Sequence, residues 1–335
     1  DVGAIHPLGK CIIIVYQTYF PYRKLMDITL IRTFLEVAAS GSFFHSSDRL
    51  FETQSAVSQR IQRLEDQLGR PLFTRSKAGV GLTTAGREFE SYALSLIKIW
   101  EEARQQIAIP QGFTRSLSIG AQYSLWPRLG FRLIDALRTE QPDLSIRAEI
   151  GLPDRLTRYL LEGVIQVGLM YTPQMRPGLR SREILDEELV LCAGWPDPKL
   201  EALPGRYVMV DWGAEFVQAH AMKLPDLTNS GITFSLGAMT ADFVRLRGLA
   251  AYLPARYAKR YIDEGMLHLV PEAPVFSHPA WAVWREDIDP ELANTTVRAL
   301  ETVVAHIDAS QDDLLQRLAE LNESGKVESF GKPEA

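Results

Sequence analysis

The chain has 335 residues, 46% hydrophobic and 23% charged, a composition ordinary for a globular protein with two or three domains. Its net charge of −6 argues against a protein that coats nucleic acid indiscriminately, although it allows a local basic site. Two cysteines and six scattered histidines predict neither a disulfide framework nor a metal centre, so we expect no metal, no cofactor and a reducing, cytoplasmic location.

Residues 1–25 differ in texture from the rest of the chain. The apolar run at residues 11–20 falls short of the roughly twenty residues that span a bilayer, and no small-residue cleavage site follows it. We therefore expect neither a signal peptide nor a membrane segment. Residues 1–25 are predicted to be a non-native or disordered extension, translated from a misassigned upstream start and without function.

Two helices are predicted next. Asp27 can cap the first, and Gly41 ends it. Its apolar positions follow the helical period: Leu30, Phe34, Val37 and Ala38. Ser42 opens a short second helix, His45 to Phe51, and only the turn around Glu52 and Thr53 separates it from the segment that follows. Two helices joined by so short a turn predict a helix-turn-helix.

The stretch from Thr53 to Gly69 predicts the second helix of that motif, with Thr53 as N-cap. Apolar residues at helical spacing predict a buried face: Val57, Ile61, Leu64 and Leu68. The other face is uncharged, where a solvated face would be rich in Lys and Glu: Gln54, Ser55, Ser58, Gln59 and Gln62. Because Gln can pair with adenine and Ser with several base edges, this face suits a DNA recognition helix. The alternative is a surface helix of an enzyme.

A basic wing is predicted after this helix. Two short apolar pieces, Leu72-Phe73 and Val80 to Leu82, flank a basic tip that contains glycine. From Arg49 to Arg87, seven basic residues stand against three acidic ones, a net charge of +4 within an acidic chain. The positive potential therefore lies where phosphate contacts are needed.

Four motifs in this region occur together: L-x-x-F-L-E-V-A-x-S-G-S-F, T-Q-S-A-V-S-Q-R-I-x-x-L-E-x-x-L-G, P-L-F-x-R and L-T-x-A-G. Through them the chain resembles LysR-type transcriptional regulators, and the resemblance extends from residue 26 to about 307. It implies a winged helix-turn-helix DNA-binding domain over residues 26–84. The resemblance places the contacts of the recognition helix on Gln54, Ser55, Ser58 and Gln59, which we assign to base edges.

Contacts to phosphates or the minor groove are expected from Thr53, Arg60, Arg63, Arg75, Lys77 and Thr83. For Arg60 and Arg63, a solvated or salt-bridged role is an equal alternative. The chain departs from the family pattern where Gln59 precedes Arg60, and where Ser46-Ser47 replaces the usual Ala-Ala. Gly81 stands where the wing is often basic, which puts minor-groove contacts by the wing in doubt.

Residues 85–110 predict a long linker helix, because no proline interrupts the sequence before Pro110. Apolar positions alternate at four and three residues, a heptad seam: Phe89, Ala93, Leu96, Trp100, Ala103 and Ile107. The helix either packs on its own domain or pairs with its copy in a second subunit. The resemblance implies the second, and a dimer places two recognition helices about 34 Å apart for a palindrome.

From Leu117 the texture changes to alternating strands and helices, which predicts an α/β domain with a parallel sheet. The first set has strands at Leu117–Gly120, Leu144–Ile150 and Val164–Met170, and helices at Trp126–Arg138 and Asp154–Glu162. The second has strands at Leu189–Ala193, Tyr207–Asp211, Ile232–Leu236, Ala250–Leu253, Leu267–Val270 and Ala280–Trp284, and helices around Glu215–Met222, Asp242–Gly248 and Glu291–Ile307.

The resemblance implies a two-lobed, periplasmic-binding-protein-like effector domain over residues 115–308. Lobe 1 is expected at 115–188 and 277–308, and lobe 2 at 189–276. The remainder, 309–335, reads as a C-terminal tail with one amphipathic helical piece followed by a polar, disordered end. The leucines of that piece are Leu314, Leu315, Leu318 and Leu321.

An effector site is expected where strand ends meet helix N-termini, since free N–H groups gather there. The candidate residues are Gln122, Tyr123, Ser124, Gly151, Leu152, Tyr171, Asp211, Trp212, Met239 and Thr240. Ser124 is the best single candidate for a ligand hydrogen bond, its alternative role being a helix cap. Trp126 and Trp212 are expected to pack rather than stack on ligand. The helix termini motivate a small anionic metabolite as effector.

These features together predict a ligand-responsive LysR-type regulator, not an enzyme. A homodimer, or a dimer of dimers, would bind double-stranded promoter DNA at a pseudo-palindrome in the nucleoid, with RNA polymerase as a further partner. One alternative is an enzyme or binding protein on the same scaffold, but no catalytic or phosphate-loop motif supports it. The other is an architectural DNA-binding protein that needs no ligand.

Overall fold

The computed structural model describes residues 27–76, 79–307, 310–322 and 325–330, and it divides into two units, Asp1–Trp100 and Glu101–Ala335. The extension expected at residues 1–25 and the predicted DNA contact Lys77 lie outside the described residues. No described helix is long and apolar enough to cross a membrane.

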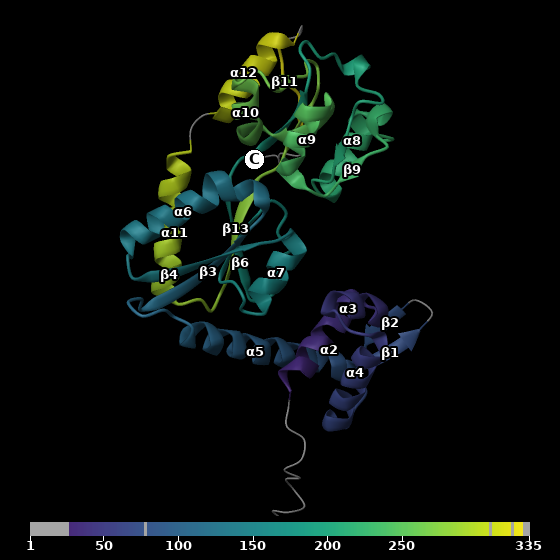
Figure 1. The fold of residues 1–335 in the computed structure, drawn as a ribbon, viewed down its shortest axis with the longest axis vertical. Coiled ribbons are helices and arrows are strands. Elements are labelled where there is room, and N and C mark those ends of the chain that lie inside the picture. Colours follow the sequence, from purple (N-terminus) through teal and green to yellow (C-terminus); the bar gives the residue numbers. More distant parts are fainter. Residues whose placement is uncertain (1–26, 77–78, 308–309, 323–324, 331–335) are drawn as a thin grey trace, which may run out of the picture. The chain divides into compact units, whose positions relative to one another are not determined.

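The first unit is a winged helix-turn-helix. Its elements are α2 (Ile28–Ser40), α3 (Phe43–Leu50), α4 (Gln54–Leu68), β1 (Phe73–Ser76), β2 (Gly79–Leu82) and most of α5 (Thr84–Ile107), with β1 and β2 paired antiparallel (Figure 1). Each of the first three helices begins at a side-chain cap, as predicted: Asp27 accepts from Thr29 N–H, Ser42 from His45 N–H and Thr53 from Ala56 N–H. Gly41 ends α2 at a φ of 62°, which glycine adopts without strain.

One apolar core holds these helices together. The side chains of Phe34, Val57 and Leu64 in it are completely buried. Leu68, predicted on the same buried face of α4, is 38% exposed, because the last turn of α4 extends past the core.

The residues of the predicted heptad seam of α5 differ in their burial along the helix. Phe89, Ala93 and Leu96 pack into the core of the first unit, so this part of the seam is intramolecular. Trp100 is 49% exposed and Ile107 86% exposed. Ala103 is exposed as well. The last turns belong to the second unit, where Glu102 pairs with Arg285 at 2.5 Å.

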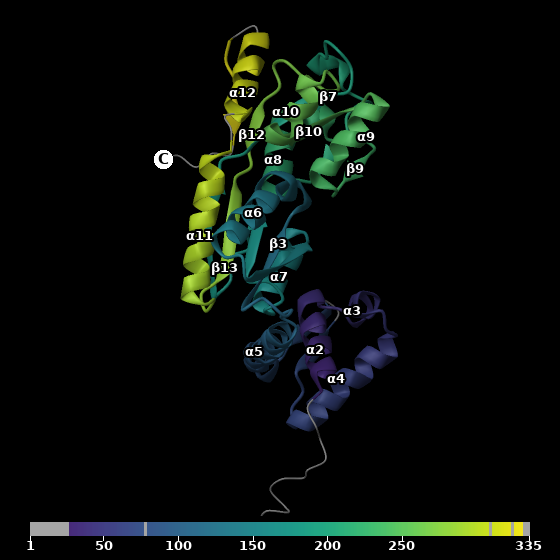
Figure 2. The ribbon, with the colours of Figure 1, turned by 60° about the vertical axis from the view of Figure 1, so that its left-hand side comes forward.

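Lobe 1 of the second unit is a five-stranded sheet with helices on both faces (Figure 2). The strand order is β4-β3-β5-β13-β6, with bounds Leu144–Ile150, Arg115–Ala121, Val167–Met170, Ala280–Arg285 and Leu179–Leu185. Helices α6 (Phe131–Glu140) and α11 (Pro290–Ala305) bury one face, and α7 (Pro153–Leu161) buries the other. The helix predicted from Trp126 begins instead with a 3₁₀ turn, Tyr123–Leu125, and a π turn, Trp126–Gly130.

Lobe 2 is built on the sheet β10-β7-β12-β14, with β11 also paired to β7. These strands are Ala250–Pro254, Glu188–Ala193, Val275–Ser277, Ser329–Phe330 and His268–Leu269, and a small parallel pair is formed by β8 (Met209–Val210) and β9 (Thr233–Phe234). Its helices are α8 (Ala214–Lys223), α9 (Thr240–Arg247), α10 (Ala255–Asp263) and α12 (Ser310–Leu321), with 3₁₀ turns at Leu200–Ala202, Pro225–Leu227 and Gly237–Met239.

The prediction of a parallel sheet is only partly right. Strand β3 is parallel to β4 and β5, but β13 is antiparallel to β5 and β6, and β7 is antiparallel to β10, β11 and β12. The chain leaves lobe 1 after β6 and returns through β12 into β13, so β13 enters the sheet in the opposite direction. Strands β6, β12 and β14 and helix α10 were not predicted.

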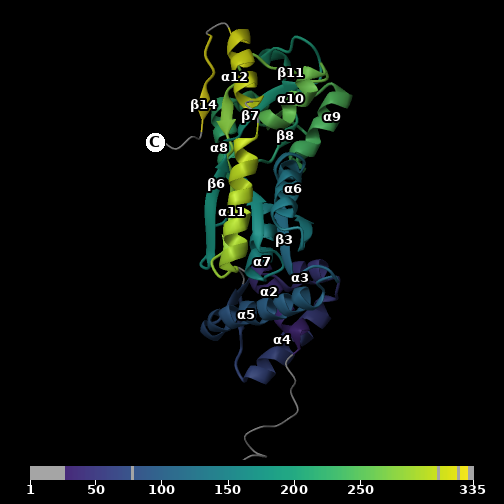
Figure 3. The same cartoon turned by 90° about the vertical axis from the view of Figure 1, so that its left-hand side faces the viewer.

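The amphipathic helical piece predicted in residues 309–335 is confirmed as α12, but the prediction that this segment is a tail is wrong for its described part. Helix α12 belongs to lobe 2, where Leu314 and Leu318 are buried in the core. Strand β14 adds to the sheet beside β12. The chain therefore crosses between the lobes a further time after α11 (Figure 3), because the leucines of the amphipathic piece find an apolar partner surface in lobe 2.

Candidate DNA-binding surface and interlobe site

The turn before α4 fixes how the recognition helix is presented. Phe51 ends α3 in the left-handed region at a φ of 54°, and Thr53 caps α4 two residues later. Arg60 reaches back from α4 to pair with Glu52 at 2.5 Å. Arg60 thus takes the salt-bridged role that the sequence left open, and it braces the turn.

The outward face of α4 carries the predicted base-reading group. Gln54, Ser55 and Gln59 are exposed and Ser58 is half-buried. Among the described residues, the amides of Gln54 and Gln59 have no hydrogen-bond partner within the protein, whereas Gln62 donates to Asp66 at 2.9 Å. The first amides of the helix are therefore available to another molecule, and that of Gln62 is engaged.

The predicted cations and hydroxyls divide by their contacts. Arg63 is exposed, and Arg75 is exposed with its guanidinium 4.5 Å from the centre of the Phe43 ring. The Thr83 hydroxyl donates to the Pro71 carbonyl at 2.8 Å and accepts from Gly86 N–H at 2.9 Å. We therefore assign Thr83 to capping α5, and leave Arg63 and Arg75 as the described phosphate candidates.

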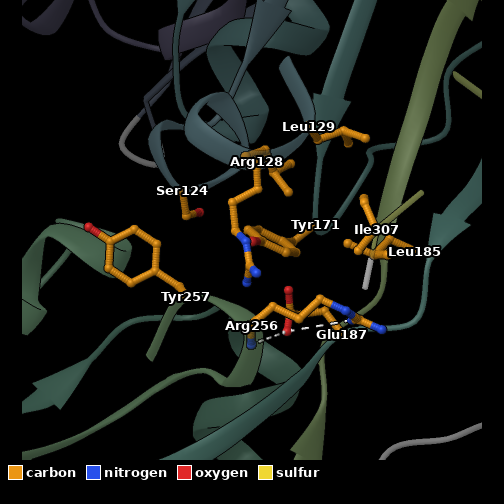
Figure 4. A pocket seen from close by; sticks show the side chains of 10 residues that line it. Ser124, Arg128, Leu129, Tyr171, Leu185, Glu187, Arg256, Tyr257 and Ile307 are labelled. Carbon is orange, nitrogen blue, oxygen red and sulfur yellow. Dashed lines mark hydrogen bonds and ion pairs between the residues drawn. The ribbon is translucent and has the colours of Figure 1, made fainter. Parts of the chain in front are cut away.

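A small pocket lies between the lobes of the second unit (Figure 4). Of the predicted effector residues, it brings together Ser124 and Tyr171. The Ser124 hydroxyl favours the ionised form of Tyr171, so the two side chains are close. Ser124 lies inside the 3₁₀ turn Tyr123–Leu125, whose N-cap position is Gln122. Burial raises the pKa of Tyr171 far above its ordinary value. The pocket has a free volume of about 10 Å³, which is room for about one water molecule.

The other predicted effector residues do not line the pocket. Gln122 accepts from Tyr171 N–H at 2.7 Å, Asp211 accepts from Gly213 N–H, and Trp212 is buried and donates to the Tyr252 carbonyl. Tyr123, Leu152 and Met239 are exposed, Gly151 is half-buried, and Thr240 is fully buried. Trp126 is also buried, with its ring against Gly130, where a Cβ would lie 2.3 Å from the ring.

Three charged residues of the pocket were missed. Glu187 lies where the chain crosses from β6 to β7, Arg256 lies in the first turn of α10, and Arg128 lies in the π turn of lobe 1. Arg256 N–H donates to Glu187 Oε1 at 3.2 Å, and its Nη1 lies 3.7 Å from the same oxygen. Figure 4 shows the Arg128 side chain extending toward the Glu187 carboxylate from the lobe 1 side.

Burial decides the electrostatics of this group. Glu187 is 3% exposed, and desolvation raises its pKa to about 7, against the opposing effect of Arg256 and Arg128. His278 is buried beside it, stacked on Tyr171 with the ring centres 4.2 Å apart, and burial lowers its pKa to about 3. The pocket is therefore a narrow, charged contact between the lobes.

Helix α12 is hydrogen-bonded to residues that form the pocket. Gln311 in the first turn of α12 is buried and bonds three groups: it accepts from Glu188 N–H at 2.8 Å and from Arg256 Nη1 at 3.0 Å, and it donates to the Asp186 carbonyl at 3.1 Å. Arg256 also donates to the Asp186 carbonyl. Both the crossover and the guanidinium are thereby fixed in place.

No metal centre is formed by the described residues: none of their His, Cys, Asp and Glu side chains gather in a group of three or more that could hold an ion.

Comparisons with known proteins match both units. A family model described as a bacterial regulatory helix-turn-helix protein of the lysR family matches residues 28–87, and the LysR substrate-binding domain matches residues 110–305. Similar curated relatives include the HTH-type transcriptional regulators HdfR of Yersinia pestis and Yersinia pseudotuberculosis. Each is 30% identical over 274 residues, which cover 79% of this chain and 92% of the relative.

Solved structures also align with the chain. A full-length OxyR variant from Pseudomonas aeruginosa aligns with a TM-score of 0.49 and 19% identity, over 85% of this chain and all of that one. ArgP from Mycobacterium tuberculosis has a TM-score of 0.48 and 20% identity, over 84% of this chain and 98% of that one. CbnR in complex with its target DNA has a TM-score of 0.43 and 20% identity, over 83% of this chain and 100% of that one.

Proposed function

This chain belongs to the LysR family of bacterial regulatory helix-turn-helix proteins, and from that premise we propose how its residues read DNA and respond to a ligand. It is a DNA-binding transcriptional regulator with an effector-responsive C-terminal domain. The observation that carries the proposal is the uncharged outward face of α4. Gln54 and Gln59 are exposed there with unengaged amides, on a helix fixed by the Thr53 cap and the Arg60–Glu52 pair.

In this proposal α4 lies in the major groove. Gln54, Ser55, Ser58 and Gln59 contact base edges, since a Gln amide presents both a donor and an acceptor to adenine. Arg63 and Arg75 contact phosphates, and Thr53 can add a phosphate contact at the helix N-terminus. The phosphate contacts supply affinity and the face of α4 supplies selectivity.

Self-association is the second part of the proposal. The exposed apolar side chains on the later turns of α5 include Ile99, Trp100 and Ile107. Pairing these turns with a second copy would remove them from water and present two recognition helices to a pseudo-palindrome. Leu236 and Met239 before α9 and Leu246 on it are further exposed apolar side chains, which we propose as a surface for assembly beyond a dimer. RNA polymerase is the partner proposed for the DNA-bound form.

The interlobe pocket is the proposed effector site, and a small anion is the proposed effector. Arg128 and Arg256 approach it from opposite lobes, with the hydroxyls of Ser124 and Tyr171 on the lobe 1 side and the Tyr257 ring at the edge (Figure 4). We assign no catalytic role to the pocket, since no histidine is among the residues that line it. No cofactor is proposed, and the protein is expected to act in the cytoplasm on chromosomal DNA.

The test is selection of genomic DNA fragments by the purified full chain and by Gln54→Ala and Ser58→Ala. We expect the wild type to enrich a dyad-symmetric motif and each variant to lose about 5- to 150-fold in affinity for it, since a base contact contributes about 1–3 kcal/mol. Gln106→Ala, an exposed glutamine outside the first unit, is the matched control and should select the same motif. Enrichment without a motif, equal in all four proteins, would refute sequence reading by α4.

A further inference from the structure

Glu187 carries a carboxylate into the interlobe pocket although it lies on the crossover between the lobes. Its neighbour Glu188 is also buried, but that carboxylate lies in lobe 2, where Oε1 accepts from the Ser329 hydroxyl at 3.0 Å. The two adjacent acidic residues therefore lie in different surroundings. Glu188 belongs to the lobe 2 sheet, and Glu187 points between the two arginines (Figure 4).

The groups around the Glu187 carboxylate are those that bind a carboxylate ligand. A backbone N–H in the first turn of α10 and the Arg256 guanidinium face one oxygen, at 3.2 and 3.7 Å. Arg128 approaches from lobe 1. A helix N-terminus with a guanidinium is a general arrangement for anions, and here it already holds one that belongs to the chain.

The pocket is too small for a ligand while Glu187 occupies it. With room for about one water molecule, the pocket as described cannot take an anionic metabolite beside Glu187. Arg128 and Arg256 are both partly buried, and loss of the Glu187 carboxylate would remove a counter-charge from them where water screens poorly, which is unfavourable. A ligand that displaces the Glu187 carboxylate must therefore supply a negative charge in its place.

From this we propose that Glu187 is a tethered occupant of the anion subsite, and that a carboxylate effector binds by taking its place between Arg256 and Arg128. The inference rests on the proposed role of the pocket as effector site. Exchange of one carboxylate for another leaves the net charge of the pocket unchanged, whereas a neutral amide of the same shape supplies no negative charge to the arginines. The chemical class of the effector is thus a carboxylate, and Glu187 sets the threshold concentration at which it binds.

Chemical rescue of the full chain tests the proposal. Glu187→Ala removes the tethered carboxylate and leaves a space suited to acetate. We expect acetate at constant ionic strength to raise the melting temperature of this variant, with a dissociation constant at least tenfold below that for the wild type. Acetamide, the neutral isostere, should give no shift. Glu188→Ala is the matched control and should respond to acetate no more than the wild type.

Two further variants keep the test decisive. Adding Arg128→Met to Glu187→Ala should abolish the acetate response. If Glu187→Ala does not fold, Glu187→Gln keeps the shape and removes the charge, and it should bind acetate at least fivefold more tightly than the wild type. Equal acetate shifts in wild type and variant, or rescue by acetamide as well, would overturn the proposal. Because this readout needs no DNA, its failure alongside intact motif selection leaves the regulatory function standing, and loss of motif selection is a separate result.

Discussion

Replacing His220 by leucine is expected to remove part of the acid sensitivity of the effector domain. His220 is completely buried in lobe 2, with its ring stacked on Tyr207 at 5.3 Å and edge-on to Tyr252. Among the described residues neither ring nitrogen has a hydrogen-bond partner. Desolvation lowers the pKa of His220 from 6.5 to about 4, so the folded protein keeps this imidazole neutral where the unfolded chain protonates it.

This difference in pKa sets the sign and size of the effect of His220 on the free energy of unfolding. Below pH 6.5 the unfolded state binds more protons than the folded state, so stability falls as pH falls, down to about pH 4. Between pH 7.5 and pH 5 this single residue lowers the free energy of unfolding by about 2 kcal/mol. Leucine has no proton to take up. It also removes two buried nitrogens without partners, so we expect about 1 kcal/mol of added stability at pH 7.5.

Urea unfolding of wild type and His220→Leu at pH 7.5 and pH 5 measures both effects. The expected result is a loss on acidification that is about 2 kcal/mol smaller in the variant than in the wild type. His268→Leu is the matched control, because it makes the same substitution at a partly exposed histidine in the same lobe. An identical acid loss in wild type and His220→Leu would refute the assignment of this sensitivity to His220.

Three further substitutions test other parts of the structure. Thr53→Ala removes the N-cap of α4 and should cost about 1 kcal/mol in thermal unfolding, with Thr74→Ala on the wing as control. Trp100→Ser should shift sedimentation toward the monomer while leaving the melting temperature nearly unchanged, since this side chain is 49% exposed; retention of the dimer would contradict the proposed α5 interface. Gln311→Leu leaves Glu188 N–H without its acceptor, so hydrogen exchange at that amide should rise at least tenfold, whereas unaltered exchange would show that α12 does not fix the crossover.

The helix-turn-helix was predictable because its signals are local. Asp27, Ser42 and Thr53 each cap the helix that follows them, and the cap, the helical period and the terminal glycine stand within one short stretch of chain. The seam of α5 was also read at the right spacing. The surface against which each seam residue packs could not be predicted, because Ala93 and Trp100 stand at equivalent positions of the repeat although one lies in a core and the other is exposed.

The interlobe site was only partly predictable. Ser124 and Tyr171 follow predicted strands, so the rule that ligands gather at strand ends reaches them. The same rule applied to β10 leads to Arg256, two residues after the strand, once α10 is recognised as the next helix. Glu187 has no such signal, since its position depends on where the chain crosses between lobes, which is a property of the whole topology.

Treating the C-terminal residues as a tail would affect the design of experiments. A family-based boundary at residue 305 gives a lobe 1 that is complete in sequence, but it removes Leu314 and Leu318 from the lobe 2 core and Gln311 from Arg256. The arginine would then lose a hydrogen-bond partner that fixes it beside Glu187, and the crossover at Asp186 would lose another. Ligand binding measured on a fragment ending there would describe a different pocket, so effector studies require the chain through β14.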